Sequence, residues 1–263
     1  TNIRFNSPLT DYDMMDSYRF MHYYNDARTN GGQAAYFSDE QIANVLAYQR
    51  GEVGKIIPVT TSNTYTHNWA NANTDWYDVF FKDHAMSQEH SLSLSGGTER
   101  FSYYLSGNFM DQEGLLNYAD ESYYRYSVNG KINAKINKNI SLSYNTKWFR
   151  TNYEAPSYLN QLFFHQIMRK WPNAFVTDPQ GYWADNSEII PLKEGGRMKE
   201  DLDQNFQQLQ LDVTPLPGWN IHLQGNMRIT TNFTHTDRQA VYAHDANGEP
   251  YAIAITNATQ PGQ

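Results

Sequence analysis

Apolar and polar residues alternate one by one in six runs between residues 87 and 231. From Phe101 to Phe109, for example, every second residue is aromatic, Leu or Gly, and the positions between them hold Ser, Tyr and Asn. Alternation with a period of two is typical of a β-strand with one apolar and one polar face. The six predicted strands cover residues 87–96, 100–110, 124–136, 140–148, 208–213 and 219–229.

The connections between these strands alternate strictly between short and long. The short ones are Gly96–Glu99, Asn137–Asn139 and Thr214–Gly218, which consist largely of turn residues. We expect Gly96 and Gly97 to supply the positive φ of a tight hairpin. The long ones cover residues 111–122, about 151–204 and the tail after the sixth strand. Short turns at one end and long loops at the other are typical of an outer-membrane barrel, with the loops outside the cell.

Aromatic residues stand near both ends of the predicted strands. Phe101 and Trp219 directly follow short turns, and Tyr124, Tyr126 and Trp148 lie near the ends that meet long loops. This distribution resembles the two aromatic girdles of a membrane barrel at its lipid–water interfaces. A soluble β-sandwich is the alternative fold, because its half-buried strands alternate in the same way and aromatic residues fill its core.

The pattern therefore predicts an all-β fold, a segment of about six strands of an antiparallel transmembrane β-barrel with long extracellular loops that carry short helices. Residues 1–86 are expected to form an extracellular loop region with short helices. Residues 87–231 hold the membrane strands, with the long loop at about 151–204, and residues 232–263 form another extracellular loop region.

Three segments outside the strands have helical patterns. Ser38 and Gln41 have the spacing of a capping box, and Gly51 ends the short helix that they open. Residues 10–29 and 156–170 are amphipathic helix candidates, and their apolar stripes are expected to pack onto the loops.

The composition narrows the class of protein. Charged residues make up 18% of the chain and aromatic residues 15%, so much of the polarity comes from uncharged side chains. No run approaches the roughly 18 to 20 apolar residues of a spanning helix, whereas a barrel strand needs only about 9 to 11 residues. Cysteine is absent, which excludes disulfides and thiolate sites.

Charge and motifs exclude further functions. The net charge is -8 and no Lys/Arg cluster is present, so nucleic acid is not an expected partner. The sequence contains no H-E-x-x-H, G-x-S-x-G or phosphate-binding loop, and its eight His residues lack zinc-ligand spacing. We therefore expect no enzymatic activity, no metal site and no cofactor.

Two segments resemble a known family. Asn73–Phe81 reads NTDWYDVFF, and Ser91–Leu116 reads SLSLSGGTERFSYYLSGNFMDQEGLL. Together with His90 they closely resemble the SusC/RagA family of TonB-dependent outer-membrane transporters of the Bacteroidetes. In that family an N-T-D-W-x-D segment precedes an H-x-L-S-x-S-G-G-T-E strand and then a Tyr- and Ser-rich strand ending in D-Q-E-G. We interpret Trp76 as a loop anchor that packs under neighbouring chain.

The resemblance implies a 22-stranded barrel in the outer membrane, plugged by an N-terminal domain and powered through TonB. It also implies a SusD-like surface lipoprotein as a lid, and import of glycan oligosaccharides or peptides. About six strands cannot stand alone in lipid, because an open sheet would leave two edges with unpaired N–H and C=O groups. We therefore expect this chain to be a fragment, an incompletely traced protein or one piece of a multi-chain barrel.

The leading hypothesis is a transporter whose polar strand faces line the lumen and whose loops form the substrate cavity. Aromatic loop residues are the candidate ligand-binding residues, because aromatic rings stack on sugars or on peptide side chains. These candidates are Tyr118, Trp171, Phe175, Tyr182 and Trp183. A soluble carbohydrate-binding β-sandwich is the alternative function, and a secreted hydrolase has the least support.

Overall fold

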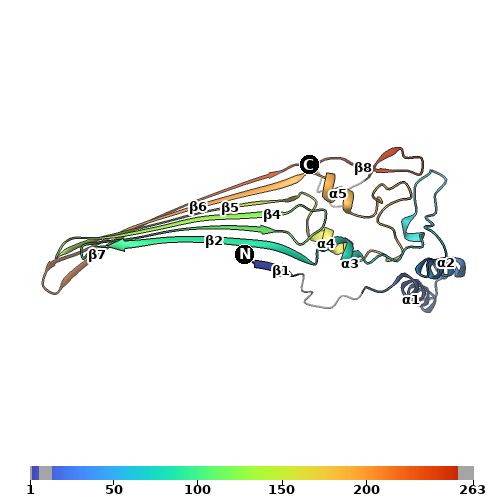
Figure 1. Cartoon of the computed structure of the whole chain (residues 1–263), viewed down its shortest axis with the longest axis horizontal. Coiled ribbons are helices and arrows are strands. Elements are labelled where there is room, and N and C mark those ends of the chain that lie inside the picture. Colours follow the sequence, from blue (N-terminus) through green and yellow to red (C-terminus); the bar gives the residue numbers. More distant parts are fainter. Residues whose placement is uncertain (1, 6–13, 254–263) are drawn as a thin grey trace.

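One long antiparallel sheet dominates the computed structural model, which describes residues 2–5 and 14–253 (Figure 1). Its strands follow one another in chain order, each hydrogen-bonded to the next. Their bounds are β1 Asn2–Phe5, β2 His84–Gly97, β3 Phe101–Glu113, β4 Ser122–Asn137, β5 Ile140–Pro156, β6 Arg197–Leu216 and β7 Trp219–Thr236. The six predicted strands correspond to β2 to β7, which confirms the all-β antiparallel fold.

The short turns lie at one end of the sheet and the long connections at the other (Figure 1). Residues 98–100, 138–139 and 217–218 make the short turns, whereas residues 114–121 and 157–196 make long connections. The predicted alternation of connection lengths is therefore confirmed.

The strands are longer at the loop end than their sequences indicate. β5 continues to Pro156 and β6 begins at Arg197, so both enter the segment at about 151–204 that was expected to be loop. In this extension the Asn152 side-chain amide donates to Asp201 at 2.6 Å across the two strands. Here the face that is apolar in the rest of β5 carries Asn152 and Asp201, whereas Ala155 and Met198 lie on the opposite face. The alternation of the predicted strands therefore does not continue into the extension.

The expectation of a positive φ at Gly96 and Gly97 is wrong. Neither residue is among the glycines with positive φ, and both lie within the regular end of β2. Space is the reason for glycine here, because a Cβ on Gly97 would meet the Phe101 carbonyl oxygen, and one on Gly96 would meet the Tyr103 ring. In the turn between β6 and β7, by contrast, Gly218 does have a positive φ of 84°.

The register joins the apolar positions into one continuous face. Leu142 pairs with Leu211, and Leu211 pairs with Leu223, so three adjacent strands place Leu side by side. Directly paired residues of an antiparallel sheet lie on the same face. No other part of the described chain covers this face, and Leu223 is 56% exposed.

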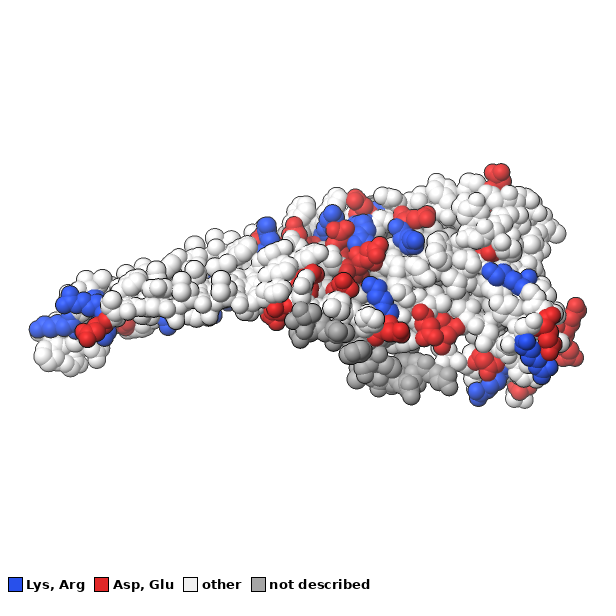
Figure 2. All heavy atoms as spheres, in the orientation of Figure 1, with Lys and Arg blue, Asp and Glu red and all other residues white. Residues whose placement is uncertain are grey.

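The apolar face has the height of a membrane. On β7 the apolar positions run from Trp219 to Ile229. Ten residue steps of about 3.4 Å give about 34 Å, which a strand tilt of about 45° reduces to about 24 Å. Outer-membrane barrels have an apolar band of about 25 Å. Figure 2 shows charged side chains at the turn end and around the loops, with few on the visible middle of the sheet.

The loops and helices pack together at one end, and we call residues 14–83, 114–121, 157–196 and 237–253 the loop assembly (Figure 1). Its elements are α1 Ser17–Asn30, α2 Asp39–Gln49, η1 His67–Trp69, α3 Trp76–Phe80, α4 Gln161–Ile167, α5 Ile189–Glu194, and the hairpin β8 Val241–His244 and β9 Pro250–Ile253. None of the helices within residues 14–253 is long and apolar enough to cross a membrane.

The predicted helices form, with shorter bounds in two cases. The capping box of Ser38 and Gln41 is present at the start of α2, as predicted. The candidate at 10–29 begins only at Ser17, where Asp16 caps α1, and its residues 10–13 lie outside the described part of the chain. The candidate at 156–170 shrinks to α4, because β5 extends to Pro156.

The arrangement differs from a β-sandwich. Buried apolar side chains are confined to the loop assembly and to the strand ends beside it, for example Trp76, Phe163 and Val241. In residues 2–5 and 14–253 the strands form the long sheet and one two-stranded hairpin, so no second long sheet covers the apolar face. The sheet therefore lacks the two-layered core of a sandwich.

Candidate functional site

The segment Asn73–Trp76 connects parts of the loop assembly to the chain before β2 through side-chain hydrogen bonds. The Asn73 side-chain oxygen accepts hydrogen bonds from the Ser17 N–H at 2.9 Å and from the Ser17 hydroxyl at 3.1 Å. The Thr74 hydroxyl donates to the Ala174 carbonyl at 2.7 Å. These two residues connect the start of α1 and the connection between β5 and β6 to the chain that leads into β2.

The next two residues fix α3. Asp75 caps the helix by accepting from the Tyr77 N–H at 2.8 Å. Trp76 is 1% exposed and donates its indole N–H to the Trp171 carbonyl at 2.9 Å. The interpretation of Trp76 as a loop anchor is therefore confirmed.

A buried cation lies against this anchor. The Lys170 ammonium is 5.0 Å from the centre of the Trp76 ring and 3.8 Å from a Glu188 carboxylate oxygen, and it donates to the Asn186 carbonyl. Burial lowers the pKa of Lys170 to about 8, and Glu188 opposes the decrease. Glu188 itself accepts from the Tyr158 hydroxyl at 2.7 Å, so both charged groups are held by neutral partners.

The five candidate aromatic residues fall into separate environments. Trp171 packs among Phe20, Tyr24, Tyr36 and Phe37, at ring-centre distances between 5.1 and 5.6 Å. These rings are part of the contact between α1, α2 and the connection between β5 and β6. Trp171 therefore contributes to packing within the loop assembly.

Phe175 is also a packing residue. It is 6% exposed, and its ring lies edge-on to Tyr48 at 5.6 Å. The Lys55 ammonium lies 4.5 Å from the centre of the Phe175 ring, which is the geometry of a cation–π contact.

The other three candidates lie elsewhere in the loop assembly, and only Tyr182 among the five is exposed. Tyr118 and Trp183 are half-buried and in edge-to-face contact at 5.3 Å. Tyr182 is 41% exposed and stacks on His244 of β8, with ring centres 3.7 Å apart. The structure thus brings Tyr118 and Trp183 together, but it does not bring all five residues into one site.

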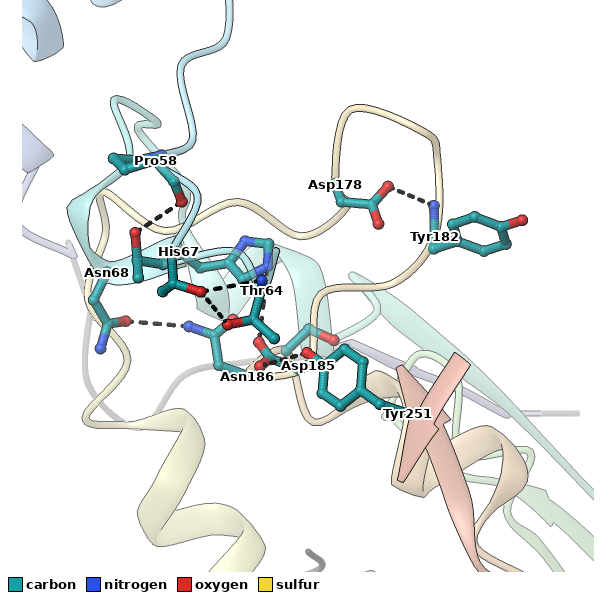
Figure 3. A network of polar contacts seen from close by, with 12 residues as sticks. Pro58, Thr64, His67, Asn68, Asp178, Tyr182, Asp185, Asn186 and Tyr251 are labelled. Carbon is teal, nitrogen blue, oxygen red and sulfur yellow. Dashed lines mark hydrogen bonds and ion pairs between the residues drawn. The ribbon is translucent and has the colours of Figure 1, made fainter. Parts of the chain in front are cut away.

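A polar network joins three parts of the loop assembly (Figure 3). His67 is 4% exposed, and its Nε2 lies 3.7 Å from an Asp185 carboxylate oxygen. The other Asp185 oxygen accepts from the Tyr251 hydroxyl of β9 at 3.0 Å. Burial lowers the pKa of His67, Asp185 opposes the decrease, and burial beside the carboxylate raises the pKa of Tyr251.

Asn186 adds a second contact between this network and η1. Its side-chain amide donates to the Asn68 side-chain oxygen at 3.1 Å (Figure 3). Among the described residues, the His67 Nδ1 is a buried atom without a hydrogen-bond partner. No group of three or more His, Asp or Glu side chains in this part of the chain converges as a metal site would require.

Two further hollows are lined by residues other than the five ligand-binding candidates. An apolar hollow of about 200 Å³ lies between α3 and α4, with lining residues that include Trp76, Tyr77, Phe81 and Phe164. A second hollow, of about 240 Å³, lies on the sheet and has Lys147, Phe149, Gln204, Phe206 and Arg228 among its lining residues. Trp76, Tyr77 and Phe81 of the first hollow belong to the motif segment Asn73–Phe81, whereas no motif marks the second hollow, which depends on residues from three strands.

Comparisons with known proteins find one receptor with a similar sequence and solved structures with the same fold. No protein-family model matches it. The TonB-dependent receptor P3 of Formosa agariphila is 28% identical over 100 residues, which cover 37% of this chain and 10% of that receptor. The chain therefore spans about a tenth of the length of this curated relative.

Solved structures share the fold over most of the chain. The RagAB peptide importer in its closed-closed state matches with a TM-score of 0.63 and 20% identity, over 90% of this chain and 28% of that chain. Its open-open state matches with a TM-score of 0.64 and 18% identity, over the same shares. The sequence likeness to a TonB-dependent receptor and the fold shared with RagAB support the predicted resemblance, so the chain is similar to the SusC/RagA family of TonB-dependent transporters and has the fold of part of their barrel.

Proposed function

We propose that this chain is part of an outer-membrane transporter that imports oligopeptides actively through TonB. The observation that carries the proposal is the apolar face shared by six registered strands, which has the height of a membrane and ends at the loop assembly. The opposite, polar face would line the lumen, and the loop assembly would lie outside the cell. The domain boundaries at residues 86, 151, 204 and 231 then separate extracellular segments from membrane strands.

Peptide import is favoured over glycan import because the solved structures with this fold are of a peptide importer. Import of glycan oligosaccharides is the second candidate. The name of that importer, RagAB, joins two components, which supports a SusD-like surface lipoprotein as a partner of the loop assembly. Contact with TonB would belong to a plug region, and outer-membrane lipid would cover the apolar face.

Uptake by intact cells tests the proposed activity. Cells that produce the full transporter should accumulate labelled oligopeptides, and cells without TonB or with a collapsed proton gradient should not. A matched set of labelled oligosaccharides tests the second candidate. Uptake of neither class, or uptake that persists without TonB, would contradict the proposal.

The candidate ligand-binding residues differ in what their loss should do. Tyr182 is the most exposed of the five, so we expect Tyr182→Ala to weaken peptide binding about two- to tenfold through loss of one aromatic contact. Trp171→Ala should instead loosen the loop assembly, because its ring is surrounded by other aromatic rings. Binding titrations and loop proteolysis on both variants separate these outcomes. If both variants lost peptide binding equally and neither loosened the loop assembly, Trp171 would not be a packing residue.

A further inference from the structure

Two cations flank an aromatic ring on the polar face of the sheet. Lys147 of β5 pairs with Phe206 of β6, and Phe206 pairs with Arg228 of β7, so the three side chains form one row. Neighbouring strands lie about 4.8 Å apart, which puts the backbones of the two cations about 10 Å apart. Their long side chains can therefore reach one ligand group above Phe206.

These cations lack the carboxylate partners of other cations on the sheet. Arg125 pairs with Glu89 at 3.3 Å, and Arg150 pairs with Asp203 at 2.5 Å. No carboxylate in the described ranges forms an ion pair with Lys147 or Arg228, and both side chains are exposed on the sheet.

The residues around this row add to the positive charge of Lys147 and Arg228. Lys131 faces the same side and lies diagonally next to Lys147, because it pairs with Asn145 on β5. The rows on either side of Lys147 contribute Ser, Asn, Gln, Thr and aromatic residues on this face but no acid. The net charge of the whole chain is -8, whereas this region of the polar face is positive. Such a concentration of one sign attracts ligands of the opposite sign.

The two aromatic rings give the site an apolar component. Phe149 and Phe206 lie on adjacent strands at diagonal positions of the face that carries Lys147, because Phe149 pairs with Gln204. Both line the hollow of about 240 Å³ together with the two cations. Gln204, another lining residue, can both donate to and accept from a peptide group.

We propose that Lys147 and Arg228 bind a carboxylate of the imported peptide, while Phe149 and Phe206 contact its apolar side chains. The inference rests on the proposed function and narrows its substrates to acidic oligopeptides. The row lies near the loop end of the apolar band, since Lys147 directly precedes Trp148 of the outward face. A ligand that enters from the loop assembly would reach this site before it reaches residues nearer the turn end of the sheet.

Equilibrium binding to the purified full transporter tests the site. The probes are two hexapeptides of the same sequence, one with two Glu residues and the other with two Gln residues instead. At low salt the unaltered transporter should bind the Glu peptide about five- to tenfold more tightly, and this preference should decrease as salt screens the charges. In the double variant Lys147→Gln with Arg228→Gln the preference should disappear, while binding of the Gln peptide stays unchanged.

Lys135→Gln is the matched control. Lys135 is an exposed cation of β4 on the polar face that carries Lys147, but it lies near the turn end of the sheet. This variant should retain the preference for the Glu peptide. Migration before and after boiling checks that every variant is folded.

Other outcomes overturn the inference in distinguishable ways. Equal binding of both peptides by the unaltered transporter would leave peptide import standing and remove the carboxylate site. A preference that survives in the double variant, or is lost equally in Lys135→Gln, would place the recognition elsewhere. If a uronate-containing oligosaccharide binds through Lys147 and Arg228 and the Glu peptide does not, the ligand is an acidic glycan and the peptide proposal fails. Binding of neither ligand class would count against the proposed function itself.

Discussion

At the scale of single residues, His67 couples the loop assembly to pH. His67 lies in η1, and its ring is buried beside Tyr65 and Asp185. Asp178, Lys55 and Lys170 are the other charged groups that act on it. Burial lowers the pKa of the folded His67 below its ordinary value of 6.5. As pH falls through 6.5, the unfolded segment takes up a proton that the folded segment does not yet bind. Local stability is therefore full above about pH 6.5 and decreases as pH falls towards the lower pKa.

We predict that the network around His67 opens more often at pH 5.5 than at pH 7.5, by up to about tenfold per pH unit. Hydrogen exchange of residues 64–71 and 241–253, corrected for intrinsic rates, measures this opening. His67→Gln should abolish the pH dependence, because Gln does not titrate in this range. His235→Gln is the control, since the His235 side chain is 57% exposed. A pH dependence that persists in His67→Gln would contradict the assignment.

Several of these residue roles could be read from the sequence and others could not. The capping box of α2 and the burial of Trp76 follow from local spacing and residue type. The partners of His67 could not be predicted, because Asp185 is more than a hundred positions away and only the folded loops bring the two together. The same holds for Trp171, which was proposed as a ligand contact but lies among the rings of α1 and the chain before α2.

At the scale of elements, the loop assembly depends on α3. Trp76 fills the core between α3, α4 and α5, so we expect Trp76→Ala to cost about 3–5 kcal/mol of local stability. Loop proteolysis on intact cells should accelerate, while the strands still migrate as a folded barrel. Trp69→Ala is the matched control, because Trp69 is 45% exposed and should be tolerated. Equal sensitivity of both variants would show that Trp76 is not the anchor.

The hairpin of β2 and β3 depends on the absence of a side chain at Gly97. A Cβ there would lie 2.8 Å from the Ser102 Cα as well as against the Phe101 carbonyl, so Gly97→Ala should force the strands apart. We predict a lower yield of folded transporter, measured as the fraction with heat-modifiable migration. Gly225→Ala on β7 should fold normally, because nothing lies within 4 Å of its added Cβ. Normal folding of Gly97→Ala would remove the spatial argument.

The sequence predicts the existence of the long strands more reliably than the residues at which they end. Alternation marks each strand where one face meets lipid and the other meets water, which is the case from Trp219 to Ile229. At the loop end of β5 and β6 the formerly apolar face carries Asn152 and Asp201, whereas Ala155 and Met198 lie on the opposite face, so the pattern changes although the hydrogen bonds continue. The short strands β8 and β9 were missed for a related reason, because four residues are too few for a period to be recognised.

At the scale of the whole molecule, one face of the sheet is apolar and has no protein partner in the described chain. The other face is polar, and Lys131, Lys147 and Arg228 make part of it positive. A sheet of this kind is stable in lipid only when its open edges pair with further strands. The loop assembly, by contrast, has its own buried clusters. We therefore predict that odd-numbered residues of β7 face lipid and even-numbered residues face the lumen.

Spin labels placed one at a time along residues 219–230 of the full transporter in membranes measure this orientation most directly. The chain contains no Cys, so each introduced Cys is the only labelling site in this segment. Accessibility to oxygen should peak at positions such as Leu223 and Met227, and accessibility to a water-soluble nickel complex should peak at Gln224 and Asn226. This period of two, with the two reagents out of phase, is the predicted result. Equal access of the water-soluble reagent to both sets of positions would contradict a membrane-spanning wall.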